Sequence, residues 1–254
     1  MPSVSIVVLT RNRPAYLAQA LRSAAAQTHS ELELVLVRDG GEPLSDECRL
    51  LLAELEFPAT VVEHDGEAEG VARSRNAGVG RARGDAVALL DDDDTWHARH
   101  VAHLAGFLGR DEKLDVVYSD ARIRREDDGD ERVIARDFDL AVFSRDDYIP
   151  PSSMLIRRES FTRFGEFDVT FPCSEDWEWL LRVAKDGGGI ARSPGVTATV
   201  LIHAGAHSAL QLKRLEERKR CLVMLAERHK LGPLTPKTFW EVAETVCPGS
   251  ATTS

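Results

Sequence analysis

Four consecutive carboxylates follow a short apolar run near the middle of this 254-residue chain. The run Val87–Leu90 has the pattern of a buried strand, and Asp91 to Asp94 come directly after it. Like charges this close raise each other's pKa or attract a counter-ion, and carboxylate oxygens suit hard cations such as Mg²⁺ or Mn²⁺. The alternative is a solvated acidic turn in which Asp94 or Thr95 caps a helix that begins near Trp96.

A second acidic pair, Glu175 and Asp176, stands at the start of a predicted helix. Trp177 and Trp179 flank Asp176, and a carboxylate beside indole rings is partly desolvated, which raises its pKa and suits a general base. The aromatic faces could also stack on a sugar ring. The alternative is that Asp176 only caps the helix.

The apolar pattern predicts an α/β chain in which strands alternate with helices. The strand Val4–Thr10 is apolar on both faces, as in a parallel sheet, and a helix and a second strand, Leu32–Val37, follow it. Right-handed crossover brings the ends of such strands to one edge of the sheet, where open α/β folds bind ligands. Further strands are predicted at Ala59–Val62, Asp115–Ser119 and Met154–Ile156, a hairpin or mobile loop at Arg122–Asp139, and helices at Ser45–Leu55, His97–Leu108, Arg158–Phe164 and Leu210–Leu231.

Two arginines, Arg73 and Arg75, lie near the start of the helix predicted after the loop His64–Gly70. At that position they could reach the same sheet edge and a bound phosphate. Alternatively, both could pair with the acidic loop beside them.

The composition limits the class of partner and the compartment. A formal net charge of -10, from 42 acidic and 32 basic residues, argues against a general nucleic-acid or anionic-membrane binder. No apolar run reaches the roughly 18 residues that a transmembrane helix needs, and no signal peptide is evident. The four cysteines are far apart in the sequence and form no CxxC pair. We therefore expect a soluble cytoplasmic protein with reduced thiols and no zinc site.

From about Val4 to Ser208 the chain resembles the family 2 inverting glycosyltransferases of the GT-A fold. The resemblance implies a single Rossmann-like domain, residues 1–209, with a mostly parallel central sheet flanked by helices, and a C-terminal helical extension, residues 210–254. The matching blocks come in the family's order: VSIVVLTRNRPAYLAQALRSAAAQ, LELVLVRDGG, GVARSRNAG, GDAVALLDDDDTW, SSMLIRRESFTRFGEFD, SEDWEWLLRV and IHAGAHS.

The resemblance also implies roles for single residues on the donor side. Asp91 and Asp93 match the DxD element, with Asp93 as the direct metal ligand and Asp91 nearer the sugar or ribose. His203, in an H-x4-S block, matches a position that reaches the metal or the diphosphate in some relatives. The nucleotide site would comprise Leu9, Thr10, Arg11, Asn12, Asp39, Arg73, Arg75, Asp91 and Asp92.

On the acceptor side, the resemblance implies that Asp176 is the catalytic base, with Glu175 beside it. The implied reaction moves a sugar from a nucleoside-diphosphate sugar to an acceptor hydroxyl, inverts the anomeric centre and uses Mn²⁺ or Mg²⁺. Arg38 and Arg11 depart from the family's usual acidic and aromatic residues, which leaves the donor open.

The sequence also fits two other classes of function, a phosphatase and a non-catalytic binding module. Asp91 to Thr95 also fits the D-x-D-x-T signature of aspartyl-phosphate phosphatases. A non-catalytic module that binds nucleotide sugars or glycans is the other alternative. The helix Leu210–Leu231 is expected to pack on the domain, or to form a homodimer contact.

Overall fold

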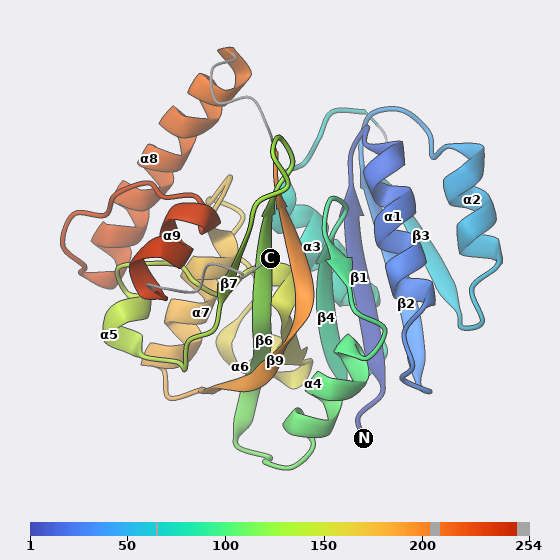
Figure 1. The fold of residues 1–254 in the computed structure, drawn as a ribbon, viewed down its shortest axis with the longest axis horizontal. Helices are drawn as coiled ribbons and strands as arrows, with labels where there is room; N and C mark the ends of the chain where they lie inside the picture. Colours follow the sequence, from blue (N-terminus) through green and yellow to red (C-terminus); the bar gives the residue numbers. More distant parts are fainter. Residues whose placement is uncertain (65, 204–208, 248–254) are drawn as a thin grey trace.

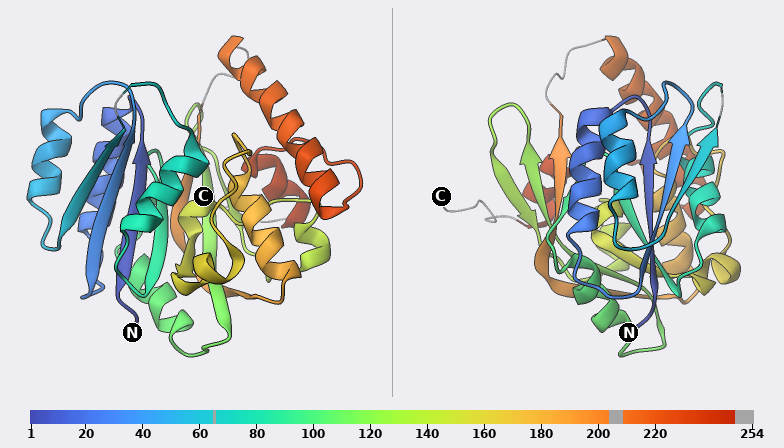
Figure 2. Two further views of the ribbon diagram at one scale, coloured as in Figure 1. Left: turned by 180° about the vertical axis from the view of Figure 1, so that it is seen from behind. Right: turned by 90° about the vertical axis from the view of Figure 1, so that its right-hand side faces the viewer.

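The computed structural model describes residues 1–64, 66–203 and 209–247. Within them, a single nine-stranded sheet runs through the molecule in the order β3-β2-β1-β4-β8-β6-β9-β5, and β7 pairs with β6 outside this path (Figure 1). Helices cover both faces of the sheet (Figure 2). The predicted single α/β domain is confirmed.

The first half of the chain forms the parallel part of the sheet. The predicted strand–helix–strand order is confirmed, because the first three strands are each followed by a helix that returns the chain to the edge of the sheet where the strand began. The elements are β1 (Val4–Thr10), α1 (Pro14–Ala25), β2 (Leu32–Asp39), α2 (Asp46–Ala53), β3 (Ala59–His64), α3 (Val71–Arg81) and β4 (Ala86–Asp91).

Alternate residues of the central strands pack into two separate hydrophobic clusters, one on each face of the sheet. In β4, Ala88 and Leu90 pack into the cluster that also holds residues of α1, α2 and α4 (His100–Leu108). Val87 and Leu89 pack into the other cluster, with residues of α3, α6 (Glu159–Phe164) and α7 (Glu175–Lys185). Because successive side chains of a strand point to opposite faces, a strand covered on both sides must be apolar throughout.

The second half of the sheet contains the antiparallel pairs. β8 (Met154–Arg157) runs antiparallel to both β4 and β6 (Leu114–Arg125), while β9 (Gly189–Ile202) runs parallel to β6. The residues expected as a hairpin or loop form the β6–β7 hairpin, with β7 at Glu131–Ile134. The sequence did not reveal β9, because Pro194 and Gly195 interrupt its pattern next to an irregularity in the register.

The C-terminal helices pack on the sheet domain. Leu222 and Leu225 of α8 (Ala209–His229) and Val242 of α9 (Phe239–Val246) are buried in the cluster of α3 and α7. The thiols of Cys173 and Cys221 lie 2.9 Å apart, so α8 also meets the loop before α7. Two short helices complete the fold, α5 (Leu140–Phe143) and η1 (Pro151–Ser153). In the described part of the chain, no helix has the length and apolar character to cross a membrane.

The burial of α8 predicts a stability difference between two of its residues. Leu225 is fully buried, so Leu225→Ala should lower the free energy of unfolding by about 2–5 kcal/mol. Val223 is 57% exposed on the same helix, so Val223→Ala should change it by about 0.5 kcal/mol or less. Urea denaturation measures both values, and equal effects would mean that α8 does not pack on the domain.

Candidate active site

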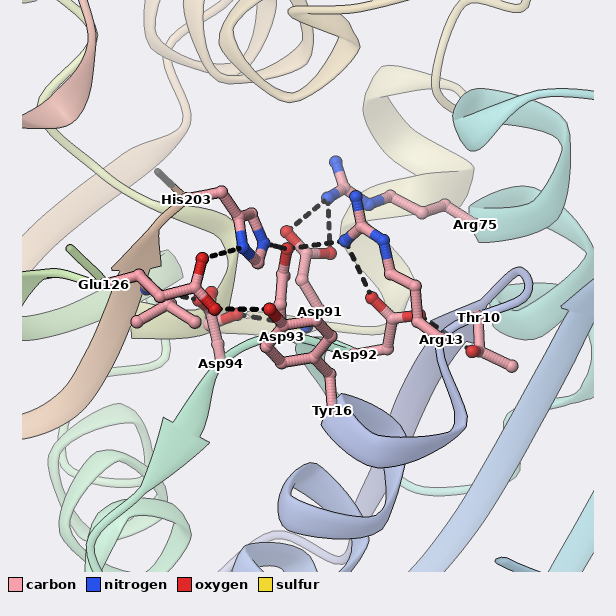
Figure 3. Close-up of polar contacts among 12 residues, drawn as sticks. Thr10, Arg13, Tyr16, Arg75, Asp91, Asp92, Asp93, Asp94, Glu126 and His203 are labelled. Atoms are coloured by element: carbon pink, nitrogen blue, oxygen red, sulfur yellow. Dashed lines mark hydrogen bonds and ion pairs between the residues drawn. The ribbon is translucent and has the colours of Figure 1, made fainter. Parts of the chain in front are cut away.

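The carboxyl end of β4 delivers the four aspartates. Asp91 is the last residue of β4 and lies opposite Leu9 of β1, and a tight turn follows in which the Asp94 amide donates to the Asp91 carbonyl at 3.1 Å. The turn sends the carboxylates in different directions (Figure 3). Asp92 accepts a hydrogen bond from Thr10 Oγ1 at 2.7 Å, at the end of β1.

The alternative of a solvated acidic turn is wrong for Asp94. Its side chain is 4% exposed and accepts a hydrogen bond from the backbone amide of Leu201 in β9 at 3.0 Å. Thr95 and Trp96 form the short strand β5, and the next helix begins only at His100. Asp94 therefore connects the turn to β9.

One carboxylate oxygen of Asp93 contacts both Arg13 and His203. Its Oδ2 lies 2.6 Å from Nη1 of Arg13 and 2.7 Å from Nε2 of His203. The same Arg13 nitrogen lies 3.2 Å from Oδ1 of Asp92 (Figure 3). Arg13 therefore supplies positive charge to the aspartate turn, a role that the sequence did not reveal.

Arg75 joins the two acidic clusters that the sequence singled out. Its guanidinium lies 2.9 Å from Asp91 Oδ1 and forms a short ion pair with Glu175, while Asp176 Oδ2 is 4.0 Å away. The side chain is buried, 3% exposed as a residue, and its partners lie at the end of β4 and at the start of α7. The end of β4 and the start of α7 thus face a common site.

The start of α7 holds Glu175 and Asp176 in a buried setting. Ser174 precedes the helix in a left-handed conformation, with φ of 61°. Glu175 and Asp176 are 3% and 8% exposed, and Asp176 Oδ1 accepts a hydrogen bond from the amide of Trp177 at 2.9 Å. That contact leaves Oδ2 as the oxygen nearer to Arg75.

The neighbouring tryptophans are core residues. Trp177 donates its indole N–H to the Phe143 carbonyl, and Trp179 donates to the Gly165 carbonyl, both at 2.8 Å. Trp179 is fully buried and Trp177 is 3% exposed. The expectation that their faces stack on a sugar is therefore wrong.

Burial raises the pKa of several of these carboxyl groups. The pKa of Glu175 rises to about 7, because burial outweighs the opposing charge of Arg75 and Asp176 adds repulsion. Burial likewise raises the pKa of Asp92 to about 6 and that of Asp91 above its usual range. The guanidinium groups of Arg75 and Arg13 are outnumbered by the carboxylates of Asp91, Asp92, Asp93, Glu175 and Asp176, so the site favours additional positive charge.

A further buried carboxylate, Asp147, was not predicted from the sequence. It is 7% exposed, and its Oδ1 makes no hydrogen bond within the described part of the chain. Burial, together with the charge of Asp176, raises its pKa well above the usual range. The stretch RDDYIPPSS around it carries no motif that would have marked it.

The residues predicted along the nucleotide site occupy the same edge of the sheet. Asp39, at the end of β2, accepts hydrogen bonds from the amides of Glu69 and Gly70, at 2.8 and 3.1 Å, and so fixes the loop before α3. Asn12 adopts a left-handed conformation, and its side chain accepts from the Glu42 amide at 2.7 Å.

The predicted arginines of this edge lie in different environments. Arg11 is exposed, and Arg73 is exposed on α3, whereas Arg75, two residues later, is buried. The spacing explains this, because residues two apart on a helix point about 200° away from each other. Arg38 is buried and pairs with Glu63 at 3.2 Å.

Only two side chains, Asp93 and His203, come together in the described part of the chain as donors for a metal. Asp93 and His203 converge, but no group of three or more His, Cys, Asp or Glu side chains is arranged to hold an ion among the residues that the structure describes. A cation at this position would need further ligands from a substrate or from water.

Comparison with known proteins identifies the family. The model of the family described as glycosyl transferase family 2 matches residues 5–173. The chain belongs to this family. It is therefore a glycosyltransferase, and the resemblance noted from the sequence is confirmed.

Individual relatives agree with this assignment. The chain is 34% identical over 247 residues to the uncharacterized glycosyltransferase YwdF of Bacillus subtilis, covering 93% of this chain and 87% of the relative. It is 32% identical over 198 residues to a PGL/p-HBAD biosynthesis glycosyltransferase of Mycobacterium bovis, covering 75% of this chain and 73% of that protein.

Solved structures agree on the fold. TarS of S. aureus superposes with a TM-score of 0.67 at 15% identity, over 96% of this chain and 42% of TarS. The mannosyltransferase PcManGT of Pyrobaculum calidifontis, solved with GDP-Man and Mn²⁺, superposes with a TM-score of 0.65 at 19% identity, over 96% of this chain and 69% of that chain. The GT-A fold is thus confirmed.

The raised pKa of Glu175 predicts how stability depends on pH. A pKa of about 7 in the folded state, above the ordinary 4.5, means that the folded protein binds this proton more tightly. The resulting stabilisation should be fully present below about pH 4.5 and should be lost as the pH rises through about 7. Glu175→Gln should flatten this dependence in urea denaturation between pH 5 and 8, without added metal. An unchanged slope in the variant would contradict the assignment.

Proposed function

We propose that this glycosyltransferase moves a sugar from a nucleoside-diphosphate sugar to an acceptor hydroxyl, with inversion, and depends on Mn²⁺ or Mg²⁺. The observation that carries the proposal is the position of Arg75 between Asp91 and Glu175. It places the aspartates of β4 and the acidic pair of α7 around one site, as a single displacement reaction requires.

The Asp93–His203 pair fits a divalent cation. Asp93 Oδ2 and His203 Nε2 are hydrogen-bonded at 2.7 Å, and a carboxylate oxygen and an imidazole nitrogen are both donor types that Mn²⁺ accepts. Two protein ligands suffice where phosphate oxygens and water complete the shell. When bound, the cation neutralises charge on the departing diphosphate. The presence of Mn²⁺ in the PcManGT complex supports this role.

The nucleotide is proposed to lie along the ends of β1 and β2. Leu9 to Asn12 and Asp39 line this edge, and Asp91 and Asp92 close it at the end of β4. The described hydrogen bonds of Arg75 go to carboxylates, so we propose that it holds the acidic side chains in place for the nucleotide. TarS has been solved with UDP and UDP-GlcNAc, and PcManGT with GDP-Man, which makes both nucleotides candidates.

Asp176 is proposed as the general base. An acceptor hydroxyl is a weak nucleophile near neutral pH, so a carboxylate within hydrogen-bond reach must take its proton as the new bond forms. The Trp177 amide holds Oδ1 of Asp176, and this orients Oδ2 as the proton acceptor. Glu175 pairs with Arg75 and positions this turn of the helix. Attack opposite the leaving group inverts the anomeric centre without a covalent enzyme intermediate.

The family assignment replaces the phosphatase interpretation of Asp91 to Thr95. In the structure, Thr95 pairs with Thr199 of β9, in strand β5. We further propose that the protein acts in the cytoplasm, which agrees with the free thiols of its four cysteines. The C-terminal dimer contact and the division at residue 209 stay predictions.

The base assignment predicts a selective loss of turnover. Asp176→Asn should fold normally but transfer sugar about 10²–10⁴-fold more slowly, because the amide cannot take the proton. Asp186→Asn, at the exposed far end of the same helix, should keep its rate. The measurement is product formation from UDP- and GDP-sugars across an acceptor panel, with the fold checked by circular dichroism. Near-normal turnover of Asp176→Asn would refute the role.

The metal assignment predicts a linked loss of binding and activity. With a nucleotide diphosphate present, Mn²⁺ at 100 times its dissociation constant should stabilise the wild type by about 2.7 kcal/mol. Asp93→Asn should lose most of that stabilisation, since Asp93 supplies one of the two protein ligands. Chelation with EDTA should abolish transfer, and added Mn²⁺ should restore it. Full activity of the metal-stripped enzyme would show that the reaction needs no cation.

A further inference from the structure

His203 is enclosed by groups from three distant parts of the chain. Its Nε2 points at Asp93, and its Nδ1 lies 3.2 Å from Oε2 of Glu126. The Tyr16 hydroxyl donates a short hydrogen bond to Oε1 of the same glutamate. The Tyr16 ring meets the imidazole edge to face, with centroids 5.0 Å apart and an interplanar angle of 74° (Figure 3).

The sheet explains how Glu126 and His203 come together. Arg125 and Ile202 are register partners at the ends of the parallel strands β6 and β9, and the Glu126 amide donates to the Ile202 carbonyl at 3.0 Å. Glu126 and His203 are the next residues of the two strands, so their side chains leave the sheet side by side. Tyr16 comes from the first turn of α1, which starts at Pro14.

Both ring nitrogens of His203 face carboxylates. A carboxylate can only accept, so Nδ1 donates to Glu126 and Nε2 donates to Asp93. A cation bound at Nε2 would take the place of the Nε2 hydrogen, and the bond from Nδ1 to Glu126 would be kept. A histidine that binds a metal through one ring nitrogen commonly donates its other N–H to a carboxylate, which fixes the ring and makes it a better ligand. The Glu126–His203–Asp93 chain has this arrangement, with Nε2 on the side of the acidic site.

We propose that Glu126, held by the Tyr16 hydroxyl, is a positioning residue that keeps Nε2 of His203 directed at the cation site and so sets the affinity for Mn²⁺ or Mg²⁺. The inference rests on the proposed function, in which His203 and Asp93 hold the cation. Glu126 and Tyr16 would thus support the metal ligands from behind, and neither residue belongs to the DxD or H-x4-S pattern.

The test is a Mn²⁺ titration followed by electron paramagnetic resonance of the free ion, first with Mn²⁺ alone and then with UDP or GDP. Glu126→Ala should raise the dissociation constant about 10–100-fold, the usual effect of losing such a partner. Tyr16→Phe, which keeps the ring, should raise it less. Glu126→Gln should recover part of the affinity, because its carbonyl oxygen can still accept from Nδ1.

Asp127→Ala is the matched control. Asp127 is the next residue in the same hairpin turn, and its carboxylate pairs with Arg125 at 2.9 Å. This variant should bind Mn²⁺ like the wild type. A positioning role also predicts that saturating Mn²⁺ returns the kcat of Glu126→Ala close to the wild-type value, whereas damage to the turn would lower kcat at every metal concentration.

The outcomes separate this inference from the proposed function. If the wild type binds Mn²⁺ and His203→Ala weakens it, but Glu126→Ala binds like the wild type, the role of Glu126 is refuted and the metal site stands. Equal weakening in Glu126→Ala and Asp127→Ala would also refute it, because the effect would then belong to the turn. If the wild type binds no Mn²⁺ with or without nucleotide, both proposals fail.

Discussion

The site depends on one buried cation, the guanidinium of Arg75. An unpaired charge in this environment would be very costly, so its carboxylate partners must be held close. Those partners are Asp91 at the end of β4 and Glu175 at the start of α7, which lie 84 residues apart in the sequence. The pairing therefore ties the parallel half of the sheet to the helices of the second half.

The position of α3 allows this pairing. Gly78, one turn after Arg75, packs so closely on β1 that a Cβ would lie 2.4 Å from Cγ1 of Val7. The missing side chain lets α3 approach the sheet and brings Arg75 to the end of β4. β1 and β4 are neighbours where the strand order reverses, and open α/β sheets bind ligands at the carboxyl ends of strands at such a point. The aspartate turn thus occupies the position that the topology favours for a ligand.

Features with a local signal could be predicted from the sequence. β1, β2 and β4 are continuous apolar runs, and the acidic pair of α7 precedes a clear helical pattern. Asp93 and His203, which the family resemblance implied as residues near the metal, lie 2.7 Å apart. The structure of these elements is set by the pattern of residues close together in the sequence, so it can be predicted without knowledge of what packs against them.

Features made by long-range packing could not be predicted. Arg13 and Glu126 find their partners, Asp93 and His203, 80 and 77 residues away in the sequence. Asp147 lies in a loop without a motif, and its position near Asp176 comes only from the packing. Trp179 was misread because α7 is buried on nearly all sides from Glu175 to Val183, whereas its apolar pattern indicates only one inner face. Asp94 was misread because its partner, the Leu201 amide, lies in a strand that the sequence did not reveal.

The most direct test of this account is a double-mutant cycle between Arg75→Met and Glu175→Gln, measured as free energies of unfolding at pH 8. The account predicts a coupling energy above about 1 kcal/mol, since each variant removes one half of a buried ion pair. The exposed pair Arg22–Glu47, with side chains 54% and 57% exposed, should couple by about 0.5 kcal/mol or less. Additive effects of Arg75→Met and Glu175→Gln, within about 0.5 kcal/mol, would contradict the central role of Arg75.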